Sequence, residues 1–137
     1  MKVVINTCYG GFGLSPKATK RLAKLEGREC YFFEQDFPEK AYIPVSVEQA
    51  SGYCTAFDIP NPNALRRSEE INRHLIHYSD SMDRSDPKLL QVVEELGKEA
   101  NGDYAKLSIV EIPDGINWVI DAYDGIECVE EAHRSWY

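Results

Sequence analysis

Three glycines fall within four positions near the start of the chain, in the stretch NTCYGGFGLSP. A short apolar run comes before them, and a serine followed by proline, which is typical of a helix start, comes after. Such a turn can present unpaired main-chain N–H groups and the positive end of a helix dipole to an anion. We therefore predict that Gly10, Gly11 and Gly13 bind a phosphate group. The alternative is a tight corner that only turns the chain and carries Phe12 and Leu14 into the core.

Side chains close to these glycines can complete such a site. The ring of Tyr9 or Phe12 can stack on a base, and Lys17 lies close enough in the sequence to add positive charge. The spacing G-G-F-G matches neither the G-x-G-x-x-G dinucleotide fingerprint nor an NTPase loop that ends in G-K-[ST]. The pattern therefore identifies neither class of nucleotide site and leaves open both a phosphorylated ligand and the tight corner.

A second set of basic residues, Arg66, Arg67 and Arg73, is concentrated in the stretch RRSEEINRH. Guanidinium groups match phosphate oxygens in bidentate fashion, so this cluster is the natural place in an acidic chain to hold a charged ligand. The alternative is a solvated helix in which the arginines pair with Glu69 and Glu70.

Cys8 follows the first apolar run, at a position where α/β proteins often place a nucleophile. A helix N-terminus lowers the pKa of a nearby thiol, which makes reactive cysteines. However, a phosphatase-type loop needs arginine at position 14, which is Leu14, and the sequence ties no histidine to Cys8. We count Cys8 among the ligand-binding candidates, with a small buried cysteine as the alternative.

The end of the chain is acidic, with carboxylates at Asp121, Asp124, Glu127, Glu130 and Glu131. These side chains can dock into a basic groove on a partner protein, or two of them can form a paired-carboxylate hydrolase site. Alternation along two strands would equally place them on a solvated face. The signatures H-E-x-x-H, G-x-S-x-G and the calcium loop are absent from the sequence.

Composition limits the class of protein. The chain has 137 residues, 43% of them hydrophobic and 28% charged, and a net charge of −8, which opposes binding to nucleic-acid backbone or anionic lipid. No run approaches the roughly 18 apolar residues of a membrane span. With no secretory signal in the sequence, we expect a cytoplasmic protein. The four cysteines include no C-x-x-C pair, which predicts reduced thiols and no zinc site, and we expect no cofactor.

Local patterns predict the elements that position these residues. Serine or aspartate followed by proline starts two helices, one from Ser15–Pro16 to Gly27 and one from Pro87 to Asn101–Gly102. A hairpin turn is expected at Asp124–Gly125. Strands are expected at residues 2–6, 29–35, 42–48 and 105–113 and in the two arms of the hairpin within 116–133.

This order favours a single α/β domain of the α+β type over residues 1–137. Its two main helices pack on a mixed sheet that carries an antiparallel C-terminal hairpin. Residues 50–86 are the least regular part and are expected to form an insertion, a lid or an oligomer contact. The terminal aromatics Trp136 and Tyr137 are expected to dock on the domain or on a second subunit, which would make a homo-oligomer.

Two stretches, KVVINTCYGGFGLS and IVEIPDGINWVIDAYDGIECVEEAHRSW, resemble a family of small, mostly uncharacterised proteins encoded by bacteriophages and prophages. In that family an N-terminal strand, glycine loop and helix are paired with a C-terminal W…YDGIE-V-E-HR-W signature. The stretch DPKLLQVVEELG is similar to the family's second helix, whereas residues 40–80 match little. The resemblance implies a phage accessory protein in the host cytoplasm and carries no reaction. By analogy, such proteins blunt host defences by sequestering a nucleotide signal or blocking a host protein.

The leading hypothesis is a non-enzymatic binding protein that captures a small phosphorylated, nucleotide-derived ligand through the glycine turn. The second is an acidic inhibitor of a host protein that docks through Asp121, Asp124 and Glu127. The third is a hydrolase or transferase on a nucleoside-like substrate, with Cys8 or Glu130 required for turnover.

Overall fold

The computed structural model describes residues 1–36, 41–51 and 54–132. In chain order its elements are β1 (Lys2–Asn6), α1 (Pro16–Leu25), β2 (Tyr31–Gln35), β3 (Tyr42–Val45), β4 (Thr55–Phe57), the 3-10 helix η1 (Pro62–Ala64), α2 (Ser68–His74), β5 (Leu75–Ile76), α3 (Pro87–Leu96), the 3-10 helix η2 (Gly97–Ala100), β6 (Leu107–Glu111), β7 (Trp118–Tyr123) and β8 (Ile126–Glu131). The predicted α+β class, the two main helices and the C-terminal hairpin are confirmed.

The described strands form three antiparallel sheets instead of the one mixed sheet expected from the sequence. Their orders are β1-β6, β3-β2-β4-β5 and β7-β8. Parallel pairing needs a helix that returns the chain to the same sheet. Here α1 carries the chain from β1 into a different sheet, and β1 takes its partner from the far end of the sequence, with Val4 opposite Ile109.

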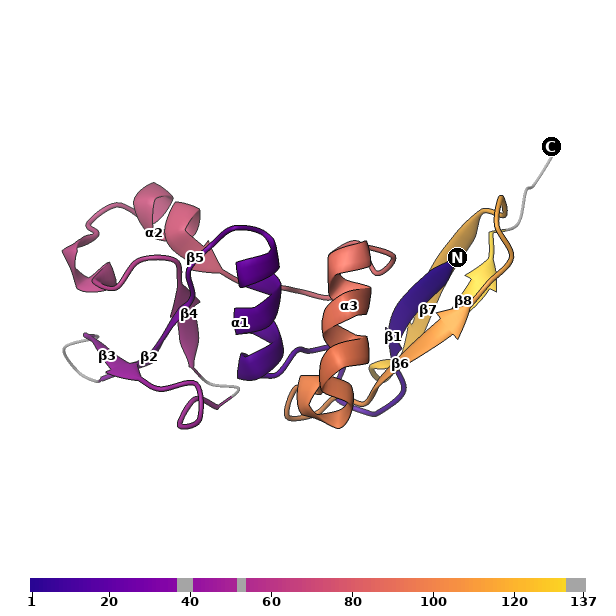
Figure 1. Ribbon diagram of the computed structural model, residues 1–137, viewed down its shortest axis with the longest axis horizontal. Coiled ribbons are helices and arrows are strands. Elements are labelled where there is room, and N and C mark those ends of the chain that lie inside the picture. Colours follow the sequence, from indigo (N-terminus) through magenta and orange to yellow (C-terminus); the bar gives the residue numbers. More distant parts are fainter. Residues whose placement is uncertain (37–40, 52–53, 133–137) are drawn as a thin grey trace.

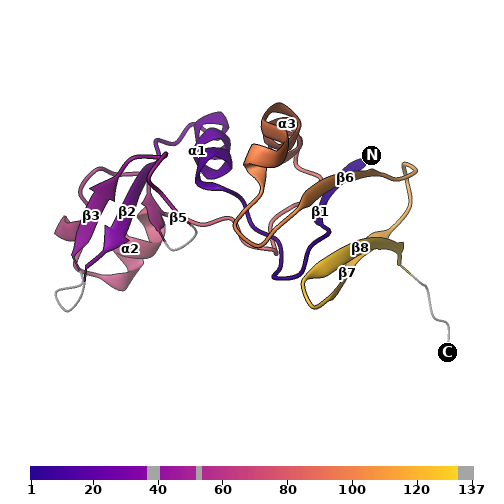
Figure 2. The ribbon, with the colours of Figure 1, turned by 90° about the horizontal axis from the view of Figure 1, so that it is seen from below.

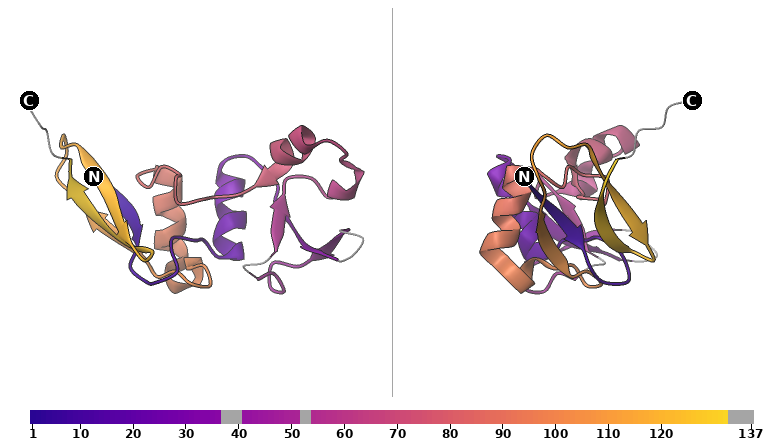
Figure 3. Two further views of the ribbon diagram at one scale, coloured as in Figure 1. Left: turned by 180° about the vertical axis from the view of Figure 1, so that it is seen from behind. Right: turned by 90° about the vertical axis from the view of Figure 1, so that its right-hand side faces the viewer.

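The elements are arranged along one long axis (Figure 1). The four-stranded sheet and α2 lie at one end, α1 and α3 lie side by side in the middle, and β1, β6 and the hairpin lie at the other end. The view from below and the view from behind show the same order (Figures 2 and 3). Helices α1 and α3 therefore separate the two ends, with α1 next to the four-stranded sheet.

Helix α1 begins because its cap is encoded locally. The Ser15 hydroxyl accepts a hydrogen bond from the Ala18 N–H at 3.1 Å, and Pro16 occupies the first helical position. The helix then buries residues on two sides. Ala18 and Leu22 pack with α3 and β1 in one core cluster, whose other buried members are Val4, Leu89, Val92, Val93 and Ala100. Ala23 packs with the four-stranded sheet in a second cluster, with Cys30, Phe32, Ala56 and Ile76.

The segment 50–86, expected to be an irregular insertion or lid, is more regular than its sequence suggests. It contains η1 and α2, and it supplies β4 and β5, two of the four strands of the largest sheet. The strands β4 and β5 are only three and two residues long, which is too short for hydrophobic alternation to reveal them.

A buried ion pair joins the hairpin to the rest of the fold. The guanidinium of Arg84 donates to both carboxylate oxygens of Glu127, at 2.7 and 2.8 Å. Only 3% of Arg84 and 8% of Glu127 is exposed. Arg84 also donates to the main-chain carbonyls of Val4 and Asp80, and its guanidinium lies 3.7 Å from the centroid of the Phe12 ring.

Asn6, fully buried at the end of β1, extends this network. Its main-chain N–H donates to Glu127 at 2.8 Å, and its side-chain amide donates to the Cys8 and Gly125 carbonyls, each at 2.7 Å. Its side-chain oxygen accepts from the N–H of Lys106 at 2.8 Å. In the part of the chain that the structure describes, every buried side-chain nitrogen and oxygen has a hydrogen-bond partner.

Two further observations concern a possible membrane span and the C-terminal aromatic residues. Among the described residues, no helix combines the length and the apolar character needed to cross a membrane. Trp136 and Tyr137, which the sequence analysis expects to dock on the domain or on a second subunit, lie outside the described residues.

We predict that Glu127→Gln lowers the free energy of unfolding by about 3–5 kcal/mol, because it leaves the Arg84 charge buried without a counter-charge. Urea unfolding followed by circular dichroism measures the loss. The matched control is Glu95→Gln, which breaks the exposed Arg21–Glu95 pair and should change stability little. Similar small losses for both variants would contradict a structural role for the buried pair.

Candidate functional site

The glycine turn, residues 8–14, is held from two sides by main chain. Gly10 and Gly11 have φ values of +106° and +97°, which only glycine adopts without strain. The N–H of Gly10 points to the Asp124 carbonyl at 3.4 Å, in the turn of the hairpin. On the other side, the Gly13 carbonyl accepts from the N–H of Gly102 at 2.9 Å.

Close approaches explain why glycines are needed on both sides of these contacts. A Cβ on Gly125 would lie 2.3 Å from the Gly11 nitrogen, and a Cβ on Gly10 would lie 2.6 Å from the Tyr104 Cβ. The hairpin turn therefore packs directly on the Gly11 nitrogen, one of the main-chain groups that an anion cradle would use. The observed contacts are those of the alternative interpretation, a tight corner, and Phe12 and Leu14 pack against the first core cluster as that interpretation expects.

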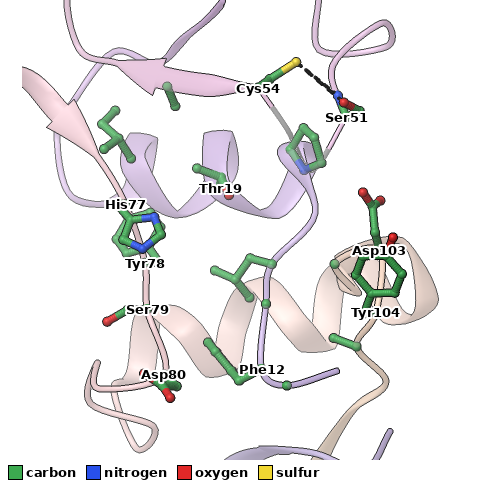
Figure 4. Close-up of a pocket in the computed structure, with 18 of the residues that line it drawn as sticks. Phe12, Thr19, Ser51, Cys54, His77, Tyr78, Ser79, Asp80, Asp103 and Tyr104 are labelled. Atoms are coloured by element: carbon green, nitrogen blue, oxygen red, sulfur yellow. Dashed lines mark hydrogen bonds between the residues drawn. The ribbon is translucent and has the colours of Figure 1, made fainter. Parts of the chain in front are cut away.

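Beside the turn lies a cleft of about 450 Å³, shown in Figure 4. It lies between the four-stranded sheet and the segments around α1 and η2, and its lining comprises residues 10–14, 16, 19, 32, 51, 54, 56, 76–80 and 102–105. The wall after β5 brings His77, Ser79 and Asp80 to one side, and Asp103 and Tyr104 lie on the opposite side (Figure 4).

The charge of this lining differs from that of a phosphate site. It includes the carboxylates of Asp80 and Asp103, and none of the described residues that line it is lysine or arginine. Tyr104 is 64% exposed, so a ligand can reach its side chain. The cleft thus offers an aromatic surface, carboxylate acceptors and hydroxyl groups.

The structure brings only part of the predicted site together. Gly10, Gly11, Phe12 and Gly13 line the cleft, whereas the other ligand-binding candidates are absent from its lining: Cys8, Tyr9, Lys17, Arg66, Arg67 and Arg73. The three arginines lie on or just before α2, at the end of the molecule farthest from the hairpin (Figure 1).

Local contacts explain these placements. Lys17 turns toward Glu99, with its Nζ 3.6 Å from a carboxylate oxygen. The N–H and carbonyl of Cys8 are both bonded to the Asn6 side chain. Glu130, the other catalytic candidate, is exposed on the hairpin and is not among the residues that line the cleft.

The sequence analysis missed the cleft residues from the two segments that face the glycine turn. The stretch HYSDS follows β5, and GDYA follows η2. Both are rich in polar side chains, but residues 79–81 suggest only a loop, and residues 102–104 only separate the second predicted helix from the strand after it. Only their clusters of hydroxyl and carboxylate groups gave a signal, and nothing local shows that residues 77–80 and 102–104 meet across a cleft.

Tyr78 is the cleft residue whose acidity the fold changes most clearly. Burial raises the pKa of its hydroxyl, and a hydrogen bond that the hydroxyl donates to the Glu26 carboxylate raises it further. The hydroxyl therefore stays protonated and fixed to α1, and it positions the wall of the cleft instead of acting as a base.

A second cluster of chemical interest lies on the hairpin. Asp121, Cys128 and Glu130 bring possible ligand atoms within 4.8 Å of one another, and all three are exposed. Exposed acidic groups often lie this close together without binding an ion, and no further observation at the cluster points to one. We therefore assign no metal to this cluster.

We predict that Gly125→Ala destabilises the fold by about 3 kcal/mol or more, because strain at φ +84° adds to the clash with Gly11. Gly115→Ala is the matched control: its φ is +80°, but a Cβ there meets nothing within 4 Å. It should cost only about 1 kcal/mol. Thermal unfolding compares the two variants, and equal shifts would show that the hairpin does not press on the glycine turn.

We predict that alkaline pH destabilises the wild type more steeply than Tyr78→Phe. The folded pKa of Tyr78 lies above its unfolded value of about 10, so its contribution is complete below that pH and is lost as pH rises above it. Cys30, whose pKa burial raises to about 11, adds the same trend to both proteins and cancels in the comparison. If the free energies of unfolding of the wild type and of Tyr78→Phe changed in parallel with pH, this result would contradict the Tyr78–Glu26 hydrogen bond.

Comparison with known proteins adds no template for this site. No protein-family model matches the chain, and neither a curated protein nor a solved structure is significantly similar to it. The resemblance to phage-encoded proteins and the cytoplasmic location stay predictions.

Proposed function

We propose that this chain is a small-molecule binding protein that holds its ligand in the cleft beside the glycine turn. The observation that carries the proposal is the cleft itself. Its volume of about 450 Å³ falls within the range of small-molecule sites, roughly 300–1,000 Å³, and it combines an apolar floor with a few polar groups.

The lining favours a ring-bearing ligand of nucleoside size. The exposed face of Tyr104 can stack on a base, and the carboxylates of Asp80 and Asp103 can accept hydrogen bonds from exocyclic amines or ribose hydroxyls. The Asp80 carboxylate repels phosphate, and Lys17, Arg66 and Arg73 are absent from the lining. A nucleoside therefore suits the cleft better than the phosphorylated ligand expected from the sequence.

Isothermal titration with the common nucleosides and their monophosphates tests this proposal. We expect nucleosides to bind more tightly than the matching monophosphates. Tyr104→Ala should weaken binding about tenfold, the loss expected from a lost stacking contact. Tyr123→Ala is the matched control because Tyr123 is 80% exposed on the hairpin, away from the cleft.

Native mass spectrometry of the purified protein gives an independent measurement, since a tightly held ligand would copurify. Absence of binding to every nucleoside and nucleotide tested, together with no copurified molecule, would overturn the proposal. Tighter binding of monophosphates would overturn the charge argument and restore the phosphorylated ligand.

A further inference from the structure

The strand β7 has an open edge in the described part of the chain. The other strand of the hairpin, β8, begins beside β1, where Asn6 donates to Glu127 and to the Gly125 carbonyl. Among the described strands β7 pairs with β8 alone. Figure 1 shows the hairpin at one end of the molecule, well away from the four-stranded sheet.

The hydrogen-bond phase of the hairpin shows which main-chain groups face this edge. The N–H of Ala132 donates to the Asn117 carbonyl at 2.8 Å, so these two residues form a hydrogen-bonded pair. Alternation along the register then directs the main-chain N–H and C=O groups of Val119, Asp121 and Tyr123 toward β8. The N–H and C=O groups directed outward belong to Trp118, Ile120 and Ala122.

The side chains around this edge are acidic and partly apolar. Residues 118–131 contain five carboxylates and no lysine, arginine or histidine. Glu127 is buried in its ion pair with Arg84. The other four carboxylates are exposed: Asp121, Asp124, Glu130 and Glu131. Val119 and Tyr123, on the same face as Asp121, are 47% and 80% exposed.

We propose that the β7 edge binds an extended basic segment of a partner protein as an added strand. Main-chain hydrogen bonds to Trp118, Ile120 and Ala122 would supply affinity, and lysine or arginine side chains opposite Asp121 would supply specificity. This surface is separate from the cleft and does not depend on the ligand proposed for it.

Asp121 decides which kind of strand can bind. Natural proteins protect open edges with charged residues, often lysine. The Asp121 carboxylate, in the middle of β7, disfavours an uncharged strand because pairing would remove it from water, and it repels an acidic strand. A second copy of this chain, which carries a net charge of −8, would bring the same exposed carboxylates together. Only a basic segment would place a lysine or arginine beside Asp121, so that the carboxylate attracts the added strand.

The test uses a fluorescein-labelled peptide of about eight residues with alternating lysine and valine, and an otherwise identical peptide with glutamate in place of lysine. Fluorescence anisotropy at low salt should show binding of the lysine peptide only, and added NaCl should weaken it. Asp121→Lys should weaken the lysine peptide about tenfold and admit the glutamate peptide. Glu48→Lys, an exposed site in the turn after β3, makes the same charge change as a matched control.

Amide hydrogen exchange separates strand addition from simple charge attraction. Binding should slow exchange at Trp118, Ile120 and Ala122, whose N–H groups face the edge, and leave Val119 and Asp121 unchanged. No binding of the lysine peptide, or binding without this alternating protection, would overturn the proposal. So would protection that rises with protein concentration alone, because a second copy would then occupy the edge.

Discussion

The ion pair between Arg84 and Glu127 is the interaction on which the other contacts of the hairpin depend. Removing two charges from water costs several kcal/mol per ion, so such a pair is tolerated only when its other hydrogen bonds are made. Here they are made by main chain: Arg84 donates to the Val4 carbonyl and accepts from the Val4 N–H through its own carbonyl, and Glu127 accepts from the Asn6 N–H. The pair thus serves the free edge of β1 as a third strand would.

Because the Arg84–Glu127 pair takes the place of a third strand beside β1, the hairpin forms its own sheet. Since the carbonyl and guanidinium of Arg84 and the carboxylate of Glu127 bond the edge of β1, β8 lies beside β1 without a main-chain ladder to it. The hairpin must then be held at its turn, and the turn reaches the rest of the fold where Gly125 packs on Gly11. The glycines at both places follow from this close approach of two backbones.

Sequence patterns predicted what is encoded locally. The caps at Ser15 and Asp86 and the Asp124–Gly125 turn each involve a few neighbouring residues, and the structure has all three. Pairing of β1 with β6 and of Arg84 with Glu127 joins residues far apart in the chain, which no local pattern encodes. The glycine turn shows the limit most clearly. Its composition suits phosphate binding or backbone contact, and the backbone contacts it makes come from residues 102–104 and 124–125, which no local pattern connects with it.

The same long-range packing determines the electrostatics of the cleft. A phosphate site needs free amides and cations at one place, but the Gly10 and Gly11 nitrogens lie against the hairpin turn, while Arg66 and Arg73 lie at the far end of the molecule. What remains at the cleft are Asp80, Asp103 and an exposed tyrosine ring. Because the described lining residues include no lysine or arginine, a ligand held there as proposed would be selected by hydrogen bonding and stacking more than by charge neutralisation.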